Sequence, residues 1–129
     1  MAKITKKACE GLSSKLDLPV PDIFSQDWEI EIASSNIAEK VLDSYIYRKD
    51  LNKDERFTLM NIVIESINDY IYQYNSKFPK MDILKNILCS EFNIYKEVII
   101  YYACLDINIE DSFPISKFMR EILLLCNDK

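Results

Sequence analysis

The chain of 129 residues contains no histidine and a single glycine, Gly11. Histidine is the usual general base and the commonest metal ligand, so its absence excludes Ser–His and Cys–His nucleophile pairs. One glycine excludes a GxGxxG or P-loop phosphate site, and it disfavours a large β architecture, because tight turns between strands consume glycine. We therefore expect a protein that is not an enzyme, with no catalytic residue, cofactor or metal site.

The four cysteines, Cys9, Cys89, Cys104 and Cys126, are too far apart in the sequence to form a CxxC pair. This spacing disfavours a zinc knuckle or a thioredoxin-like motif. We expect buried free thiols in a reducing cytoplasm, with structural disulfides as the alternative. The longest apolar run, residues 98–105, is too short to span a membrane, and the N-terminal residues lack a signal-peptide pattern. The sequence thus predicts a soluble cytoplasmic protein.

Hydrophobic residues make up 49% of the chain, and 21 acidic against 16 basic residues give a formal charge of −5. A chain of this length and apolar content can bury a sizeable core as one domain. Its negative charge disfavours nucleic acid as a partner and favours a basic protein. We therefore expect residues 1–129 to form a single domain whose partner is neither nucleic acid nor membrane.

The chain is organised around the stretch from residue 54 to residue 74. Apolar residues recur there in alternate steps of three and four, which places them on one side of an α-helix. That side holds Phe57, Met60, Ile64, Ile67, Ile71 and Tyr74, widened by Val63 and Tyr70. The side expected to face water holds Thr58, Asn61, Glu65, Asn68 and Asp69. Asn52 and Glu55 have the spacing of a capping box, which predicts where this helix begins, and Pro79 lies beyond its end.

Five further amphipathic segments predict an all-α fold, a single compact bundle of about six helices around the central one. Their expected ranges are residues 3–16, 37–48, 81–91, 94–105 and 116–126. The segment 94–105 is apolar on nearly all sides, and its β-branched residues leave a buried strand as the alternative. Asn36 with Glu39, then Asn93 and Ser116, stand where N-caps of three of these helices are expected.

Residues 27–32 alternate acidic and apolar side chains (DWEIEI), which is the period of a β-strand. No second strand is evident, so we expect an extended segment that follows a proline-containing connector over residues 17–26. Its inward side chains would be Trp28, Ile30 and Ile32, and its outward ones Glu29 and Glu31. Trp28 is the only tryptophan, and it is either a core anchor or an anchor for a partner.

Two acidic segments and an excess of tyrosine favour a protein-binding surface. Paired carboxylates can hold magnesium or perform acid–base chemistry, but neither segment has the DxDxDG rhythm of a calcium loop. Solvated carboxylates and contacts to a cationic partner are the remaining interpretations. Of the eight tyrosines, Tyr47 and Tyr72 fall off the apolar stripes, so we expect them to be exposed. The candidate partner-binding residues are Asp27, Trp28, Glu29, Glu31, Tyr72, Asp106, Glu110 and Asp111.

Two stretches carry a resemblance to a known family. The first is Trp28-Glu29, followed by a capped helix and residues 54–60 (DERFTLM). The second is residues 101–106 (YYACLD) with residues 110–115 (EDSFPI) and Met119-Arg120. Together they resemble small α-helical immunity proteins of bacterial toxin systems of the contact-dependent growth inhibition type.

The resemblance implies a protein that binds one cognate toxin domain in the cytoplasm and blocks it, with no shared catalytic residues. Such toxins are often nucleases with basic clefts, which an acidic inhibitor suits. The alternative is a helical adaptor or regulatory domain whose protein partner is not a toxin. A homodimer through the central helix is a further alternative, but its stripe spans fewer than three heptads, so we expect a monomer.

Overall fold

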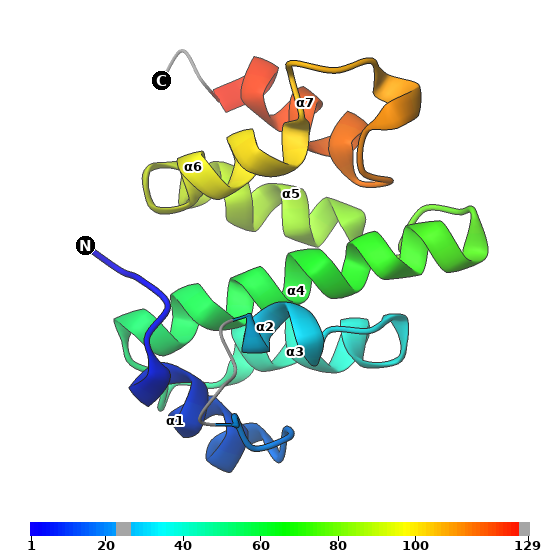
Figure 1. The fold of residues 1–129 in the computed structure, drawn as a ribbon. Helices are drawn as coiled ribbons and strands as arrows, with labels where there is room; N and C mark the ends of the chain where they lie inside the picture. Colours follow the sequence, from blue (N-terminus) through cyan, green and yellow to red (C-terminus); the bar gives the residue numbers. More distant parts are fainter. Residues whose placement is uncertain (23–26, 127–129) are drawn as a thin grey trace. The chain divides into compact units, whose positions relative to one another are not determined.

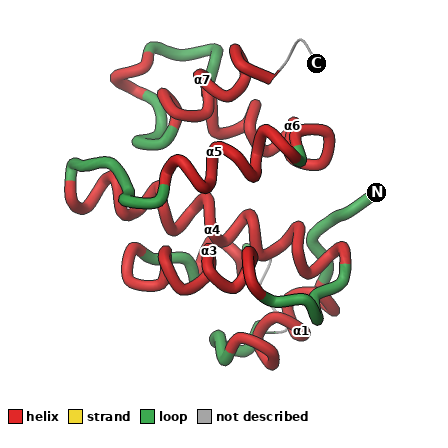
Figure 2. Tube along the Cα trace, turned by 180° about the vertical axis from the view of Figure 1, so that it is seen from behind, coloured by secondary structure: helices red, strands yellow, loops and turns green. Residues whose placement is uncertain are grey.

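The protein is all-α, as predicted. A computed structural model describes residues 1–22 and 27–126, and within these ranges it contains helices and loops but no strand (Figure 2). The elements are α1 (Lys6–Leu16), α2 (Trp28–Glu31), η1 (Ser35–Ile37), α3 (Ala38–Tyr47), α4 (Lys53–Tyr74), α5 (Met81–Ser90), α6 (Phe92–Ala103), η2 (Ile109–Asp111) and α7 (Ser116–Cys126) (Figure 1). The segment 94–105 therefore forms a helix, α6, over most of its length, and not the buried strand that was the alternative. The connector expected over residues 17–26 can be followed to residue 22, and its last four residues lie outside the described ranges.

Backbone contacts divide the chain into two compact units, Met1–Ile67 and Asn68–Lys129. The long helix α4 contributes its first fifteen residues to the first unit and its remainder to the second. The expectation of a single domain over residues 1–129 stays a prediction.

In the first unit, α1 begins at Thr5, whose hydroxyl accepts a hydrogen bond from the Ala8 N–H at 3.0 Å. It ends at Asp17, which takes the left-handed conformation with φ of 55°. The buried apolar side of α1 is Ala8, Cys9, Leu12 and Leu16. Helix α3 meets the start of α4 through Arg56, whose guanidinium lies 4.2 Å from the centre of the Tyr45 ring.

The predicted capping box begins α4. The Glu55 N–H donates to Asn52 Oδ1 at 2.8 Å, and the Asn52 N–H donates to Glu55 Oε1 at 2.9 Å. The capping box predicted at Asn36 and Glu39 does not begin α3. The 3₁₀ turn η1 leads into that helix, and Ile37, which has no capping side-chain bond, occupies the N-cap position.

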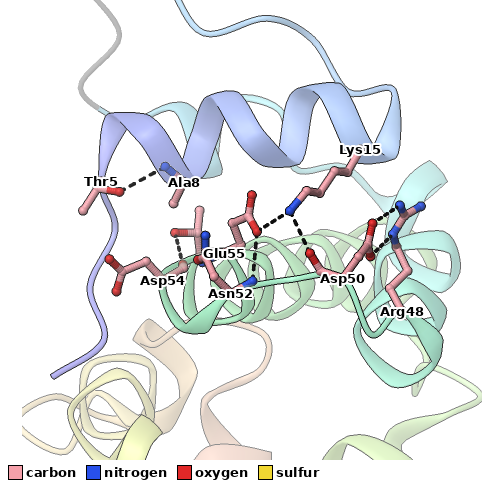
Figure 3. Close-up of polar contacts among 9 residues, drawn as sticks. Thr5, Ala8, Lys15, Arg48, Asp50, Asn52, Asp54 and Glu55 are labelled. Atoms are coloured by element: carbon pink, nitrogen blue, oxygen red, sulfur yellow. Dashed lines mark hydrogen bonds and ion pairs between the residues drawn. The ribbon is translucent and has the colours of Figure 1, made fainter.

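Figure 3 shows a polar network that joins α1 to this helix start. Lys15 Nζ lies 2.7 Å from Glu55 Oε1 and donates to the Asp50 carbonyl oxygen, also at 2.7 Å. Gly11 stands over the same carboxylate, because a Cβ added there would overlap Glu55 Oε2 and lie 3.1 Å from Glu55 Cδ. The only glycine of the chain thus marks a place where a side chain on α1 would require the Glu55 carboxylate to move.

The polar side predicted for α4 is wrong at Thr58 and Asn68, which are both buried. The Thr58 hydroxyl donates to the Asp54 carbonyl at 2.8 Å within the helix, and Asn68 Oδ1 accepts from the Ile115 N–H at 3.0 Å within the second unit. Polar side chains can be buried when their hydrogen bonds are met, so residue type alone did not identify the water-facing side. Tyr74, which we expected on the apolar side, is 51% exposed.

In the second unit, α7 packs against α6 and α5 (Figures 1 and 2). Two predicted caps are wrong here. The break between α5 and α6 takes a single residue, Glu91, which is the C-cap of one helix and the N-cap of the next, so Asn93 already lies in the first turn of α6. Ser116 is the first residue of α7, and its buried hydroxyl donates to the Tyr102 carbonyl at 2.6 Å instead of capping its own helix.

Candidate partner-binding surfaces

The segment 27–32 forms the single helical turn α2, and the prediction of an extended segment is wrong. The Glu31 N–H donates to the Asp27 carbonyl at 2.9 Å, and the Ile32 N–H donates to the Trp28 carbonyl at 3.0 Å. An extended segment needs a neighbouring strand to take up its backbone groups, whereas a helical turn satisfies them locally. Since the described residues 1–22 and 27–126 contain no strand to pair with it, the helical turn is the better arrangement.

This turn places the side chains on different sides from those expected. Trp28 is 4% exposed, and its indole N–H donates to the Pro19 carbonyl at 2.9 Å, so it is a core anchor. Glu29, expected outward, is only 8% exposed, and Ile30, expected inward, is 44% exposed. Asp27 and Glu31 are exposed, and they alone of the four candidate residues in this segment lie on the surface.

Glu29 lies in unfavourable surroundings for a carboxylate. Its Oε1 atom is buried and has no hydrogen-bond partner among the residues that the structure describes. Burial, together with the nearby charges of Asp27 and Glu31, raises the pKa of Glu29 above the ordinary value of a glutamate. Burial and the charge of Glu29 also raise the pKa of the Cys9 thiol to about 11. Glu29 is thus better suited to the neutral acid than to the anion.

In the second unit, the candidate residues Asp106, Glu110 and Asp111 are all exposed, as predicted. Large apolar side chains are exposed beside them in the sequence, at the end of α6 and in the loop that follows. We call this the 101–111 surface, and it consists of Tyr101, Leu105, Asp106, Ile107, Ile109, Glu110 and Asp111. Tyr101 and Leu105 are each 62% exposed, so much of its apolar area is open to solvent. An exposed apolar group bordered by charge is typical of a protein-binding surface.

The backbone under the 101–111 surface is held from α7. The Nε atom of Arg120 donates to the Ala103 carbonyl at 2.6 Å. Its Nη2 atom donates to the Cys104 carbonyl and, at 3.0 Å, to the Ile107 carbonyl. The ring of Phe113 packs 5.7 Å from that of Tyr101, between ring centres. Sequence reasoning missed the role of Arg120, although a cation is favoured beside the carbonyls that end a helix such as α6. The surface is therefore presented on an ordered backbone.

The two predicted tyrosines are exposed, Tyr47 at 74% and Tyr72 at 79%. Tyr47 belongs to the first unit and Tyr72 to the second. The acidic residues of α2 likewise belong to the first unit, and the 101–111 surface belongs to the second. The two candidate groups are therefore treated as separate surfaces.

Among the residues that the structure describes, no three cysteine, aspartate or glutamate side chains come together in a way that could hold a metal ion. None of the described helices has the length and apolarity needed to cross a membrane. The four cysteines are all thiols, buried at Cys9 and Cys126 and partly buried at the other two positions.

No protein-family model matches the chain. No curated protein and no solved structure matches it either. On the 101–111 surface, exposed apolar side chains, negative charge and a backbone held by Arg120 occur together.

Proposed function

We propose that this protein is an immunity protein, which binds a cognate bacterial toxin domain in the cytoplasm and neutralises it by contact. The partner is a basic domain, such as a nuclease with a cationic cleft, and this protein binds it as a monomer without catalysis. The observation that supports the proposal is the 101–111 surface, in which three exposed carboxylates and exposed apolar side chains follow one another along the chain. The chain's net charge of −5 acts in the same direction.

The two kinds of side chain on this surface have different tasks. The carboxylates of Asp106, Glu110 and Asp111 attract a basic partner and increase the rate of encounter, an effect that salt weakens. Tyr101 and Leu105 supply the apolar area that supports most of the affinity once water is excluded. Because Arg120 already orders the loop backbone, binding loses little conformational entropy there. A stable complex of this kind buries about 1,600 Å² in total.

Co-expression with the product of the neighbouring upstream gene tests the role. We expect the toxin to stop growth when expressed alone, and this protein to restore growth. Continued killing would refute the immunity role for that pair, and binding without any toxicity of the upstream product would favour a helical adaptor.

Charge reversal tests the surface. The variant carries Asp106→Lys, Glu110→Lys and Asp111→Lys, and the matched control carries Asp82→Lys, Glu97→Lys and Glu121→Lys, which are also exposed and in the second unit. We expect the first variant to lose binding at least tenfold and to lose most of its salt dependence, while the control keeps both. Equal losses in the two would mean that only net charge matters and would contradict the assignment to this surface. A third variant, Asp27→Lys with Glu31→Lys, measures the contribution of the exposed acids of α2.

A further inference from the structure

Glu29 is a buried acid for which the described part of the chain offers no compensating charge. It is 8% exposed, and its Oε1 atom lacks a hydrogen-bond partner there. The ion pair of Lys15 with Glu55 and that of Arg48 with Asp50 do not include Glu29. Since burying an unpaired carboxylate is strongly unfavourable, the structure favours the protonated form of this side chain.

The charged side chains near Glu29 make its ionisation harder. Asp27 and Glu31 flank it on its own helix, and from α1 the Cys9 thiol comes close enough to be affected by its charge. The first two add negative charge, and the thiol is neutral because its pKa is about 11. A hydrogen bond from the backbone N–H of Glu29 favours the anion, but burial and the two negative charges outweigh it, so the pKa of Glu29 is raised.

The helix that carries Glu29 is short. Helix α2 contains four residues, and its N-cap residue Asp27 makes no capping bond through its side chain. Its main attachments are the buried ring of Trp28 and the hydrogen bond from that indole to the Pro19 carbonyl. A single helical turn has little stability of its own, so its docking depends on these side chains and on the state of Glu29.

We propose that Glu29 is a protonation-controlled latch for α2. The docked turn holds Glu29 as the neutral acid; when the carboxyl loses its proton to solvent, α2 is released and Trp28 becomes exposed. Release brings the indole and the carboxylates of Asp27, Glu29 and Glu31 to the surface together, which creates a second acidic surface with an aromatic anchor. The latch is independent of the proposed function, because it is a property of the first unit alone.

The direction of the pH dependence follows from linkage. The docked form has the higher pKa, so it binds the proton more tightly than the released form does. Docking is strongest below the ordinary glutamate value of 4.5. As the pH rises above that value, the ratio of docked to released α2 falls tenfold per pH unit, until it levels off above the pKa of docked Glu29.

Trp28 is the only tryptophan, so its emission and its quenching by acrylamide report the docking of α2 in the full-length protein. We expect emission to shift to the red and quenching to increase as the pH rises, in a transition of one proton centred above 4.5. The variant Glu29→Gln should keep the blue emission throughout, because its neutral amide replaces the acid at equal size. Glu29→Met should behave alike and serves if the amide variant folds poorly. The control Glu31→Gln, at an exposed neighbour, should titrate like the wild type.

Other results would overturn the latch. A wild-type Trp28 signal that does not change with pH would overturn the latch, because it would show that α2 stays docked over the whole range. A transition that persists unchanged in Glu29→Gln or Glu29→Met would assign the titration to another group. Far-ultraviolet circular dichroism over the same range separates release of α2 from unfolding of the chain, because α2 is only four residues long.

Discussion

At Gly11, the packing seen in the structure and the intrinsic helix propensity predict opposite effects of an alanine substitution on stability. Alanine is favoured over glycine in a helix interior by about 1 kcal/mol, so Gly11→Ala would ordinarily stabilise α1. The added methyl group would, however, overlap the carboxylate of Glu55, which is itself only 3% exposed. The substitution therefore requires Glu55 to leave its position.

The cost follows from what that carboxylate binds. Glu55 Oε1 accepts from the Asn52 N–H at 2.9 Å and lies 2.7 Å from Lys15 Nζ. Hydrogen bonds to charged groups are worth about 1.5–3 kcal/mol each, and the partial exposure of Lys15 places its contribution at the low end. Displacing the carboxylate then costs about 3 kcal/mol, which exceeds the propensity gain. We expect Gly11→Ala to lower the free energy of unfolding by about 2 kcal/mol.

Urea unfolding followed by Trp28 fluorescence measures this free energy, because Trp28 and Gly11 belong to the same unit. The decisive comparison is the same substitution in a Glu55→Ala background. With the obstacle removed, alanine at position 11 should stabilise the protein by about 1 kcal/mol, so the sign of the effect reverses. Ser14→Ala, at an exposed position of the same helix, should stabilise slightly in both backgrounds. A Gly11→Ala protein more stable than the wild type would refute the reasoning.

Two further predictions concern single side chains. Replacing Arg120 by methionine should destabilise the second unit by about 2 kcal/mol or more, because backbone carbonyls lose charged donors. Urea unfolding followed by circular dichroism measures this loss. The control Lys117→Met, at an exposed neighbour on α7, should have almost no effect, and equal losses in the two variants would contradict the role of Arg120. In alkylation followed by mass spectrometry, the partly exposed Cys104 should react before Cys9 at neutral pH. The alkylation rate of Cys9 should increase as the pH approaches 11. Rapid modification of Cys9 at neutral pH would show that its site is open.

The helices were predictable where local rules act alone. Steps of three and four apolar residues identified α4, and the spacing of Asn52 and Glu55 predicted its first turn, since both signals lie within a few residues of the chain. The alternation in residues 27–32 misled because it is too short to separate a strand from a helical turn without knowing whether a second strand is present. The caps expected at Asn93 and Ser116 failed because the lengths of the links between helices were not known from the sequence.

For the candidate site, the sequence alone predicted that Asp106, Glu110, Asp111 and Tyr72 would be exposed, because polar residues in a loop and residues off an apolar stripe have no reason to be buried. It did not predict that Arg120 orders the loop, or that Glu29 is buried with its Oε1 atom unpaired among the described residues. Both depend on which side chains from distant parts of the chain come within a few ångströms of each other. Composition and periodicity thus specified an acidic, all-helical protein without the residues for common catalysis, whereas tertiary packing alone decided which acids stay in water and which are buried.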